Sequence, residues 1–330
     1  MKECLFYKTL DNKKVLCTLC PKACTIDNNS TGFCGVRKNV NGMLYSLSYS
    51  NLVSLALDPI EKKPLFHFFP NNKILSVATV GCNLDCLNCQ NFEIAHGDYS
   101  SINSQHITPK ELVSYCVEND ISFIAYTYNE PTVFYEYVLE TSKLAKDKGI
   151  KTVSITNGYI NEKPLLELSK YLDAANIDVK GFSDQTYEQL TTGKLNPVLN
   201  TIKLLKENAV WVELTWLVVP GFSDNSIEFK NFVNWLANLD KNIPLHISRF
   251  FPYYKLSHLQ PTSIEKMKEF FTIAKSKLNF VYLGNVLEES NTYCPKCGSL
   301  LIKRLGYVTS DFTKEGHCLN CGYKLPGVFQ

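Results

Sequence analysis

The sequence has no apolar run long enough to cross a membrane and no block of basic residues. Its longest apolar stretches are interrupted and strand-sized, and residues 1–8 lack the apolar segment of a signal peptide. Lysine plus arginine number 34 against 32 for aspartate plus glutamate, which argues against nucleic acid or an anionic membrane as the main partner. Internal repeats and low-complexity segments are absent as well. We therefore expect a cytoplasmic protein.

The composition also excludes a disordered chain. With 330 residues, of which 45% are hydrophobic, the chain can bury one large core and carry smaller appendages. Its 13 cysteines would indicate disulfides in a small secreted protein, but clustered pairs in a cytosolic chain more often bind metal. Eleven of them fall into three clusters. Of the other two, Cys116 lies on the apolar stripe of a helix that begins at the capping box Thr108 to Glu111, so we expect it in the core, and Cys4 has no assigned role.

The central cluster consists of Cys82, Cys86 and Cys89, spaced C-x3-C-x2-C directly after the apolar run 74–78. Iron–sulfur clusters are usually held by four thiolates, so a set of three predicts a [4Fe-4S] cluster with one iron free of protein ligands. S-adenosylmethionine (SAM) can bind such an iron through its amino and carboxylate groups. The reduced cluster can then cleave SAM to a 5'-deoxyadenosyl radical.

A buried helix is the alternative for this segment, because positions i, i+4 and i+7 share one helix face. The intervening residues argue against it. Gly81, Asn83, Asp85 and Asn88 are poor helix formers, and the run before them is strand-like.

The first cysteine cluster is Cys17, Cys20, Cys24 and Cys34. Four soft ligands in a short glycine-containing segment suit a tetrahedral metal ion, which would stabilise a piece too small for its own core. Zinc is our first expectation. An auxiliary iron–sulfur cluster is the second, since four cysteines ligate either group, and a site without metal is the third.

The last cluster, in residues 291–330, is the clearest metal module. Cys294 and Cys297 form one C-x2-C-Gly knuckle and Cys318 and Cys321 the other, with twenty residues between the pairs. This spacing predicts a zinc ribbon, with a rubredoxin-like iron as the alternative. A ribbon of this size serves docking or stability more often than catalysis.

From about residue 73 to 290 strand-like and helix-like segments alternate, which is typical of βα units and a parallel sheet. Residues 42–57 predict a strand pair ahead of this domain, and the box Thr262 to Glu265 predicts the start of a late helix. We expect three parts: residues 1–72, 73–290 and 291–330. The expected strands of the main part are 74–79, 121–127, 150–156, 173–179, 210–218 and 243–250, with a weaker one at 280–283.

A C-x3-C-x2-C motif after a first strand resembles the signature of the radical SAM superfamily. Three further segments, Cys17 to Cys24, Asp58 to Pro70 and Leu245 to Phe250, are similar to the radical SAM member of the AmmeMemoRadiSam system, and the likeness covers nearly the whole chain. It implies an α/β fold with an open partial (β/α)6 TIM-type barrel. It also implies a [4Fe-4S] cluster, SAM, an electron donor of the flavodoxin or ferredoxin type, and partners of the Memo and AMMECR types. One departure is Asn88, because the position before the third cysteine is usually aromatic and lies against the SAM adenine.

In parallel sheets the chemistry sits where the strands end. Asn129 and Glu130 follow the second strand and resemble the glycine-glycine-glutamate motif of the superfamily; they would cap a helix or bind the SAM ammonium. The later strand ends resemble glycyl-radical activases, in which the matching polar groups contact SAM: here they are Thr156, Asn157, Asp178 and Lys180. Lys180 would otherwise be a solvent lysine. Ile155 stands where activases often have an acid, so we expect no cation site there.

Three further residues are candidates for the catalytic site. His67 lies between phenylalanines and is either a hydrogen-bonded core residue or, as the resemblance suggests, a neighbour of the active site. His246 faces either the mouth of the sheet or the surface. Arg249 would bind an anionic substrate group or pair with an acid.

The main hypothesis is therefore a reductive radical enzyme that forms methionine and a 5'-deoxyadenosyl radical, which takes hydrogen from an unidentified substrate. An activase that makes a glycyl radical on a partner enzyme is the alternative within this class. The competing class is a non-enzymatic metal scaffold or electron carrier.

Overall fold

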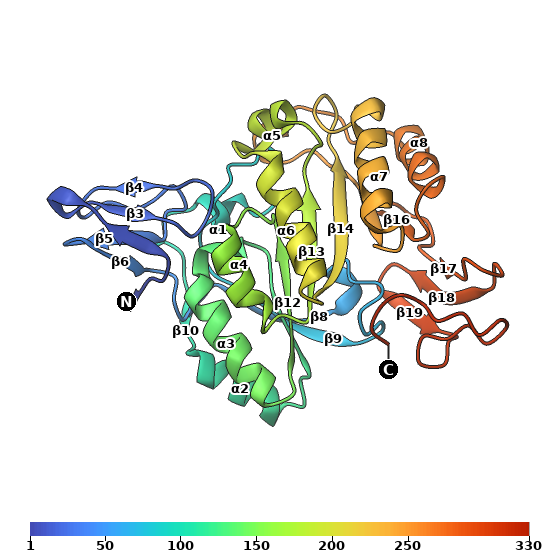
Figure 1. Cartoon of the computed structure of the whole chain (residues 1–330), viewed down its shortest axis with the longest axis horizontal. Coiled ribbons are helices and arrows are strands. Elements are labelled where there is room, and N and C mark those ends of the chain that lie inside the picture. Colours follow the sequence, from blue (N-terminus) through green and yellow to red (C-terminus); the bar gives the residue numbers. More distant parts are fainter. Residues whose placement is uncertain (330) are drawn as a thin grey trace.

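The computed structural model describes residues 1–329. A central α/β unit lies between two small β modules, which Figure 1 shows at opposite ends of the long axis of the molecule: the N-terminal strands on one side and the C-terminal strands on the other. The chemistry discussed below involves all three parts.

The central unit is built on one eight-stranded mixed sheet. Its order is β16-β15-β14-β13-β12-β11-β9-β8; all neighbouring pairs are parallel except β8 with β9. The seven expected strands are all present, because each was signalled by a short apolar run of the kind buried between two layers. The strands are β8 (Ser54–Pro59), β9 (Lys73–Ala78), β11 (Phe123–Tyr126), β12 (Lys151–Thr156), β13 (Ala174–Val179), β14 (Trp211–Val218), β15 (Leu245–Arg249) and β16 (Val281–Gly284).

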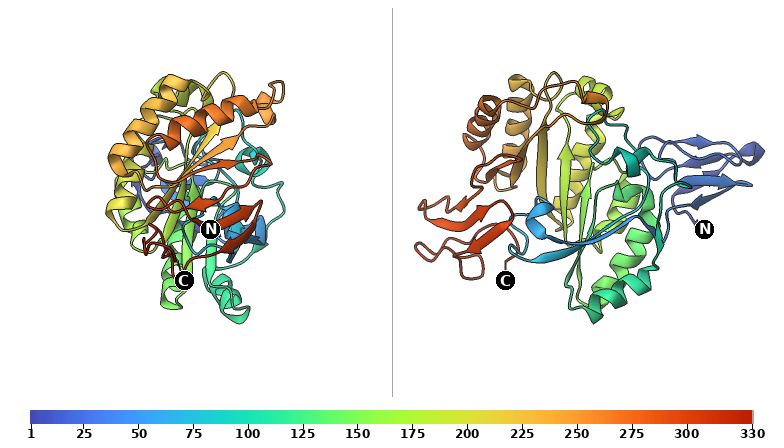
Figure 2. Two further views of the ribbon diagram at one scale, coloured as in Figure 1. Left: turned by 90° about the vertical axis from the view of Figure 1, so that its right-hand side faces the viewer. Right: turned by 180° about the vertical axis from the view of Figure 1, so that it is seen from behind.

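Helices cover one face of this sheet. Figure 1 shows α3, α4, α6 and α7 in front of the strands, whereas the strands are in view from behind in Figure 2. The helices are α1 (Phe92–His96), α2 (Pro109–Glu118), α3 (Tyr135–Asp147), α4 (Glu162–Ser169), α5 (Asp184–Thr191), α6 (Leu195–Glu207), α7 (Ser226–Asp240) and α8 (Ile264–Lys275). α2 begins with the expected capping box, in which Thr108 and Glu111 bond each other's backbone amides, and Cys116 is buried as expected.

Two local predictions were wrong. The segments at 43–47 and 52–57 do not pair with each other: β6 (Met43–Ser46) joins an N-terminal sheet, while β8 pairs with β9 at the edge of the main sheet. Apolar runs predict strands but not their partners. The box Thr262 to Glu265 does not form either. Ser263 is the N-cap of α8, and the Thr262 hydroxyl is bonded to the carbonyl of Val218 instead.

The N-terminal module contains two three-stranded sheets. One has the order β1-β6-β5, with β1 (Lys2–Glu3) and β5 (Arg37–Val40), and the other has β2 (Tyr7–Thr9), β3 (Val15–Cys17) and β4 (Thr25–Ile26). A buried ion pair joins the module to α3: Arg37 Nη1 lies 3.1 Å from both carboxylate oxygens of Glu136. A separate short antiparallel pair joins β7 (Asn51–Leu52) to β10 (Gln105–His106).

The C-terminal module has three antiparallel strands, β17 (Thr292–Tyr293), β18 (Leu300–Leu305) and β19 (Val308–Asp311). It is packed against the segment that leads into β9. Arg304 Nη2 donates to the carbonyl of Phe66 at 2.7 Å, and the amide of Phe69 donates to the carbonyl of Val328 at 2.7 Å. This module therefore closes one end of the main sheet.

The strand order gives an open, mainly parallel sheet that ends in β16 and β8. The expected six-unit partial barrel and the division of the chain at residues 72 and 290 stay predictions. Within residues 1–329, no helix is both long and apolar enough to span a membrane.

Candidate active site

A cavity of about 330 Å³ lies where the parallel strands end. This volume is within the range of small-molecule sites. The three cysteines of the central cluster line it together with polar residues from the ends of five strands. The polar residues include Asn129 and Glu130 after β11, Thr156 at the end of β12 and Asn157 after it, Asp178 on β13 and Lys180 after it, Thr215 on β14 and Ser248 on β15.

The cysteine loop between β9 and α1 is irregular, so the buried-helix alternative is excluded. Gly81 permits its turn, with φ +103°, and a Cβ at this position would lie 2.7 Å from the carbonyl oxygen of Cys34. The amides of Asp85 and Leu87 donate to the carbonyls of Thr191 and Leu190 at the end of α5. The loop is thus held by backbone bonds on both sides of Cys86.

Burial raises the pKa of all three thiols, to about 12 for Cys86, and the nearby Lys180 opposes the rise at Cys86 and Cys89. Without iron these cysteines are therefore protonated at neutral pH. Metal binding would release their protons, because thiolates are the ligands.

Glu130 is the most heavily bonded acid of the cavity, and it is 3% exposed. Its Oε1 accepts from the amide and the hydroxyl of Thr132 at 2.9 and 2.6 Å and from the Thr156 hydroxyl at 2.7 Å. Its Oε2 accepts from the amide of Asn157 at 2.8 Å. Burial raises the pKa of Glu130, although these bonds oppose the rise. Glu130 therefore has two roles. Its bond to the Thr132 amide caps the short 3-10 helix Pro131–Phe134, and the same residue lines the cavity.

Asn129 connects the β11 end to the cysteine loop. Its Oδ1 accepts from the amide of Thr79, and its Nδ2 donates to the carbonyl of Gly81, each at 3.1 Å. One alternative from the sequence was that Asn129 caps the following helix; this was wrong, because the cap is Glu130. The observed role of Asn129 is to fix the start of the loop.

Asn157 connects the β12 end to the same loop. Its Nδ2 lies 3.8 Å from Cys82 Sγ and donates to Asn83 Oδ1 at 2.9 Å. An amide donor near a ligand sulfur stabilises the thiolate form and tunes the metal group that the sulfur holds.

Lys180 places a positive charge in the cavity wall, directly after β13. Its Nζ lies 3.1 Å from Asp178 Oδ2. Burial opposes the charge, but Asp178 and Cys86 outweigh it and hold the pKa of Lys180 above its ordinary value. Lys180 is therefore not a solvent lysine but a cation at the cavity wall, suited to an anionic group.

Comparisons with known proteins agree with this geometry. Residues 76–234, which include the cysteine loop and strands β11 to β14, match the family model described as the radical SAM superfamily. The chain belongs to the radical SAM superfamily. It is 43% identical to the uncharacterized protein MJ0808 of Methanocaldococcus jannaschii, over 98% of this chain and 99% of that protein.

A pyruvate formate-lyase-activating enzyme of Staphylococcus epidermidis is 26% identical over 58% of this chain and 84% of the relative. Among solved structures, a radical SAM methyltransferase from Sphaerobacter thermophilus is similar with a TM-score of 0.49 and 13% identity, covering 66% of this chain and 67% of that one. The family match and the similarity to the activating enzyme of Staphylococcus epidermidis show that this chain is a radical SAM enzyme related to activating enzymes. The family implies a [4Fe-4S] cluster and SAM.

The cavity residues fit both groups. Cys82, Cys86 and Cys89 open into one space, and among the described residues no fourth cysteine lines that cavity. Asn88 supplies a second sign: it is 7% exposed, lines the cavity, and its Oδ1 has no hydrogen-bond partner within residues 1–329. This oxygen is therefore free to accept a hydrogen bond from a molecule bound in the cavity.

Sequence reasoning missed a second charged group in the radical SAM cavity. Lys62 and Lys63 line the wall, and both bond the Asp58 carboxylate at 2.8 Å, which the Tyr128 hydroxyl also reaches at 2.6 Å. Hydrogen bonds from the two lysines outweigh burial and hold the pKa of Asp58 below its usual value. The adjacent lysines in the sequence could have indicated this charged group, but their position beside Tyr128 follows only from the fold.

The three catalytic candidates do not line the cavity. His246 is buried below it, with Nε2 2.7 Å from Glu213 Oε2, and His67 is bonded through Nε2 to Tyr282 Oη at 2.6 Å and through Nδ1 to the carbonyl of Pro326 at 2.7 Å. Arg249 donates from Nε to the carbonyl of Thr262. Of the two alternatives for His67, the structure shows the hydrogen-bonded core residue. His246 therefore lies neither at the surface nor in the cavity wall, the two positions expected from the sequence.

The C-terminal cysteines form a compact metal-binding group. The possible ligand atoms of Cys294, Cys297, Cys318 and Cys321 lie within 4.8 Å of one another, with sulfur separations of 3.5 Å (Cys294 to Cys321) and 3.6 Å (Cys297 to Cys318). A tetrahedral site with metal–sulfur bonds of about 2.3 Å requires separations of about 3.8 Å. The residues therefore fit one tetrahedral ion.

Proposed function

We propose that this chain is the radical SAM enzyme of an AmmeMemoRadiSam system, with its cluster on Cys82, Cys86 and Cys89. The observation that carries the cluster assignment is that these three sulfurs share one cavity with the polar strand ends. The assignment to an AmmeMemoRadiSam system rests on the resemblance of the segments Cys17 to Cys24, Asp58 to Pro70 and Leu245 to Phe250. When bound and reduced, a three-cysteine [4Fe-4S] cluster supplies the electron that cleaves SAM to methionine and a 5'-deoxyadenosyl radical.

Glu130 would bind the SAM ammonium through Oε2. Its Oε1 already accepts three hydrogen bonds, whereas Oε2 accepts one, so Oε2 has the remaining capacity. Asn129, Thr156 and Asn157 hold the surrounding loops and shape this part of the cavity. Lys180, kept charged by Asp178, would pair with the SAM carboxylate.

Asn88 would replace the aromatic contact that is usual before the third cysteine. Its unpartnered Oδ1 can accept a hydrogen bond from the amino group of the adenine. Such a contact would hold the adenine through a directional hydrogen bond instead of through stacking on an aromatic ring.

The substrate would bind on the Lys62 and Lys63 side of the cavity. Two ammonium groups face one Asp58 carboxylate there, so this wall has a positive balance that suits an anionic group. We extend the proposal to the remaining expectations: a flavodoxin- or ferredoxin-type donor, Memo-type and AMMECR-type partners, and zinc on the C-terminal cysteines.

The test is anaerobic reconstitution followed by reduction in the presence of SAM. Wild-type enzyme should form 5'-deoxyadenosine and methionine, and C82A, which lacks one cluster ligand, should not. If the iron and sulfide content confirms a loaded cluster and SAM is still not cleaved, the proposal is wrong. A scaffold or carrier would also leave the cluster spectrum unchanged when SAM is added.

An activase is the second candidate, because the matched relatives include pyruvate formate-lyase-activating enzymes. It would take hydrogen from a glycine of a partner enzyme. Electron paramagnetic resonance (EPR) on mixtures with Memo-type, AMMECR-type or glycyl-radical partners distinguishes the two, since a glycyl radical persists on the partner after this enzyme has been removed.

A further inference from the structure

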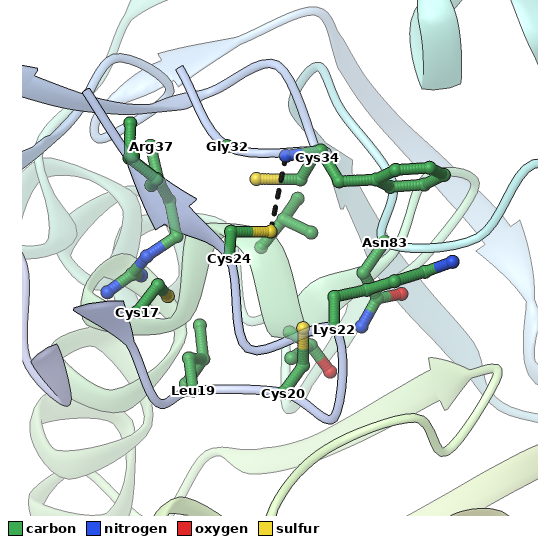
Figure 3. A pocket seen from close by; sticks show the side chains of 13 residues that line it. Cys17, Leu19, Cys20, Lys22, Cys24, Gly32, Cys34, Arg37 and Asn83 are labelled. Atoms are coloured by element: carbon green, nitrogen blue, oxygen red, sulfur yellow. Dashed lines mark hydrogen bonds between the residues drawn. The ribbon is translucent and has the colours of Figure 1, made fainter. Parts of the chain in front are cut away.

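The four N-terminal cysteines line one small space. Cys17 ends β3, Cys20 and Cys24 lie in the loop to β4, and Cys34 precedes β5. Figure 3 shows the sulfurs of Cys20, Cys24 and Cys34 directed into the region between these segments. The space has a volume of about 20 Å³, which is enough for one water-sized particle. It can therefore hold a single ion, but it has no room for a cluster with its own sulfides.

The turn after Cys34 repeats a feature of the C-terminal metal group. Gly35 directly follows Cys34 and has φ +76°. The glycines that directly follow Cys297 and Cys321 have φ +76° and +70°. A Cβ at any of these three glycines would meet no atom within 4 Å, so the left-handed backbone accounts for glycine there, not crowding. The N-terminal set thus contains one knuckle with the backbone turn of both C-terminal knuckles.

Backbone amides point at the sulfurs of this set. The amide of Phe33 donates to Cys24 Sγ at 3.4 Å (Figure 3). Burial raises the pKa of Cys20 and Cys34, and backbone amides oppose the rise at both thiols. Amide donors around ligand sulfurs stabilise the thiolate form that binds a metal. The loop is therefore prepared for thiolates.

Two cations in the pocket wall suit a negatively charged metal centre. Four thiolates around one divalent ion carry a net charge of about −2, which is costly to bury without a partner. Lys22 and Arg37 both line the pocket. Arg37 is 2% exposed; it donates from Nη1 to Glu136 and from Nη2 to the carbonyl of Leu5, while its Nε has no partner among the described residues. This Nε is therefore free to donate to a ligand sulfur.

Ion binding would draw the four sulfurs together. A tetrahedral zinc needs sulfurs about 3.8 Å apart. Within residues 1–329, the C-terminal group is the one in which three or more possible ligand atoms lie within 4.8 Å of one another. Cysteine side chains change position by rotation between staggered conformations about the Cα–Cβ bond. We therefore expect the ion to have a measurable effect on this segment.

We infer that one tetrahedral metal ion of the zinc type is bound by the four N-terminal cysteines, Cys17, Cys20, Cys24 and Cys34. Zinc forms closed structural sites with four thiolates. The assignment does not depend on the function proposed above, because it follows from the volume, the turn and the donors. It keeps the first expectation from the sequence and sets the auxiliary cluster aside.

The ion would also brace the loops around the radical SAM cavity. The amide of Asn161 donates to the carbonyl of Leu19 at 3.0 Å, and its Nδ2 donates to the carbonyl of Thr18 at 2.9 Å. Gly81 lies against the carbonyl of Cys34, where a Cβ would come within 2.7 Å. The metal-binding segment is thus in contact with the loops that follow β9 and β12. An ion that fixes this segment would fix both loops from outside the cavity.

Metal analysis of the protein as purified gives the first test. Wild type should contain about one zinc ion per chain more than the double variant C20S/C34S. C116A, which removes a buried cysteine of α2, is the control and should match the wild type. Equal zinc contents of wild type and double variant would overturn the assignment. A double variant that loses iron and acid-labile sulfide instead of zinc would overturn it as well.

Anomalous scattering from crystals of the wild type gives the second test, which does not require the double variant to fold. A peak at the zinc edge between the four sulfurs, with none at the iron edge, is expected. Iron at this position, or no anomalous peak there beyond that of the sulfurs, would contradict the inference.

Hydrogen exchange at Asn161 tests the effect on the radical SAM loops. Its amide is bonded to Leu19 of the metal-binding segment, so it should exchange roughly tenfold faster in the double variant. Ile124, whose strand β11 lies between two parallel neighbours, should exchange at the same rate in both proteins. Equal rates at Asn161, in a double variant that has lost its zinc, would show that the ion does not brace these loops. The measurement needs neither SAM nor a reductant, so its outcome is separate from the proposed function.

Discussion

Glu130 and Asn157 join the ends of two neighbouring strands: Glu130 Oε2 accepts from the Asn157 amide at 2.8 Å. Asn157 in turn lies 3.8 Å from Cys82 Sγ. The carboxylate that follows β11 is therefore connected through one residue to Cys82, which we propose as a cluster ligand. A change at Glu130 should be detected both in SAM binding and in the cluster.

E130Q should weaken SAM binding about tenfold to a hundredfold, because a hydrogen bond to a charged group contributes about 1.5–3 kcal/mol. The iron content should be nearly unchanged. Titration of the reconstituted protein with SAM measures the affinity, and E140Q, which alters a half-buried glutamate of α3 outside the cavity, is the matched control. Equal affinities of E130Q and wild type would show that Glu130 only caps the helix.

N88L should also bind SAM more weakly, by about fivefold, since it removes the unpartnered acceptor and keeps the side-chain size. The cluster itself should load normally. The measurement is the SAM-dependent change in the EPR signal of the reduced cluster. S-adenosyl analogues without the adenine amino group should show no difference between N88L and wild type, and a difference that persists would place Asn88 elsewhere.

His67 predicts a pH dependence of stability. Burial lowers the pKa of His67 to about 4, against about 6.5 in the unfolded chain. As the pH falls, His67 takes up a proton in the unfolded chain before it does so in the folded one. The contribution of the neutral His67 to the free energy of unfolding is therefore complete above about pH 6.5 and is lost as the pH falls from about 6.5 towards 4. The loss amounts to about 3 kcal/mol.

Denaturant titrations between pH 4 and pH 8 measure this loss. The H67Q variant should be less stable at pH 8 but should show a flatter pH profile, because its side chain does not titrate. Parallel profiles for H67Q and wild type would assign the acid sensitivity to other groups.

If the C-terminal module holds the proposed metal ion, C297S should release it and lower the thermal unfolding midpoint. The four sulfurs fit one ion, and loss of one ligand leaves the others unpaired. The radical SAM cavity shares no residue with this group, so SAM binding should change little. Elemental analysis together with calorimetry checks both parts; unchanged metal content would mean that the ion is not held there.

Much of the fold could be predicted because its signals are local. Each parallel strand is an apolar run bounded by turn residues, and Thr108 with Glu111 marks a helix start within four residues. The three cysteines are likewise a local motif. The pairing of β8 with β9 is different, because apolar alternation is the same whichever partner a strand finds.

The buried network around Glu213 could not be predicted in this way. Its oxygens accept from the amides of Phe66 and His67 at 3.0 and 2.7 Å and from His246, residues far apart in the sequence. His67 and His246 were singled out as histidines, but only the fold shows that they serve the interior below the cavity. Asn88 was noticed only as a departure, since an unpartnered oxygen is a property of the packed chain.

The C-terminal contacts impose an order on biosynthesis. His67 completes its hydrogen bonds only with the carbonyl of Pro326, and Phe69 only with that of Val328. Those partners leave the ribosome after every strand of the main sheet has been translated. The segment that leads into β9 therefore stays without these hydrogen-bond partners until the C-terminal module has been translated.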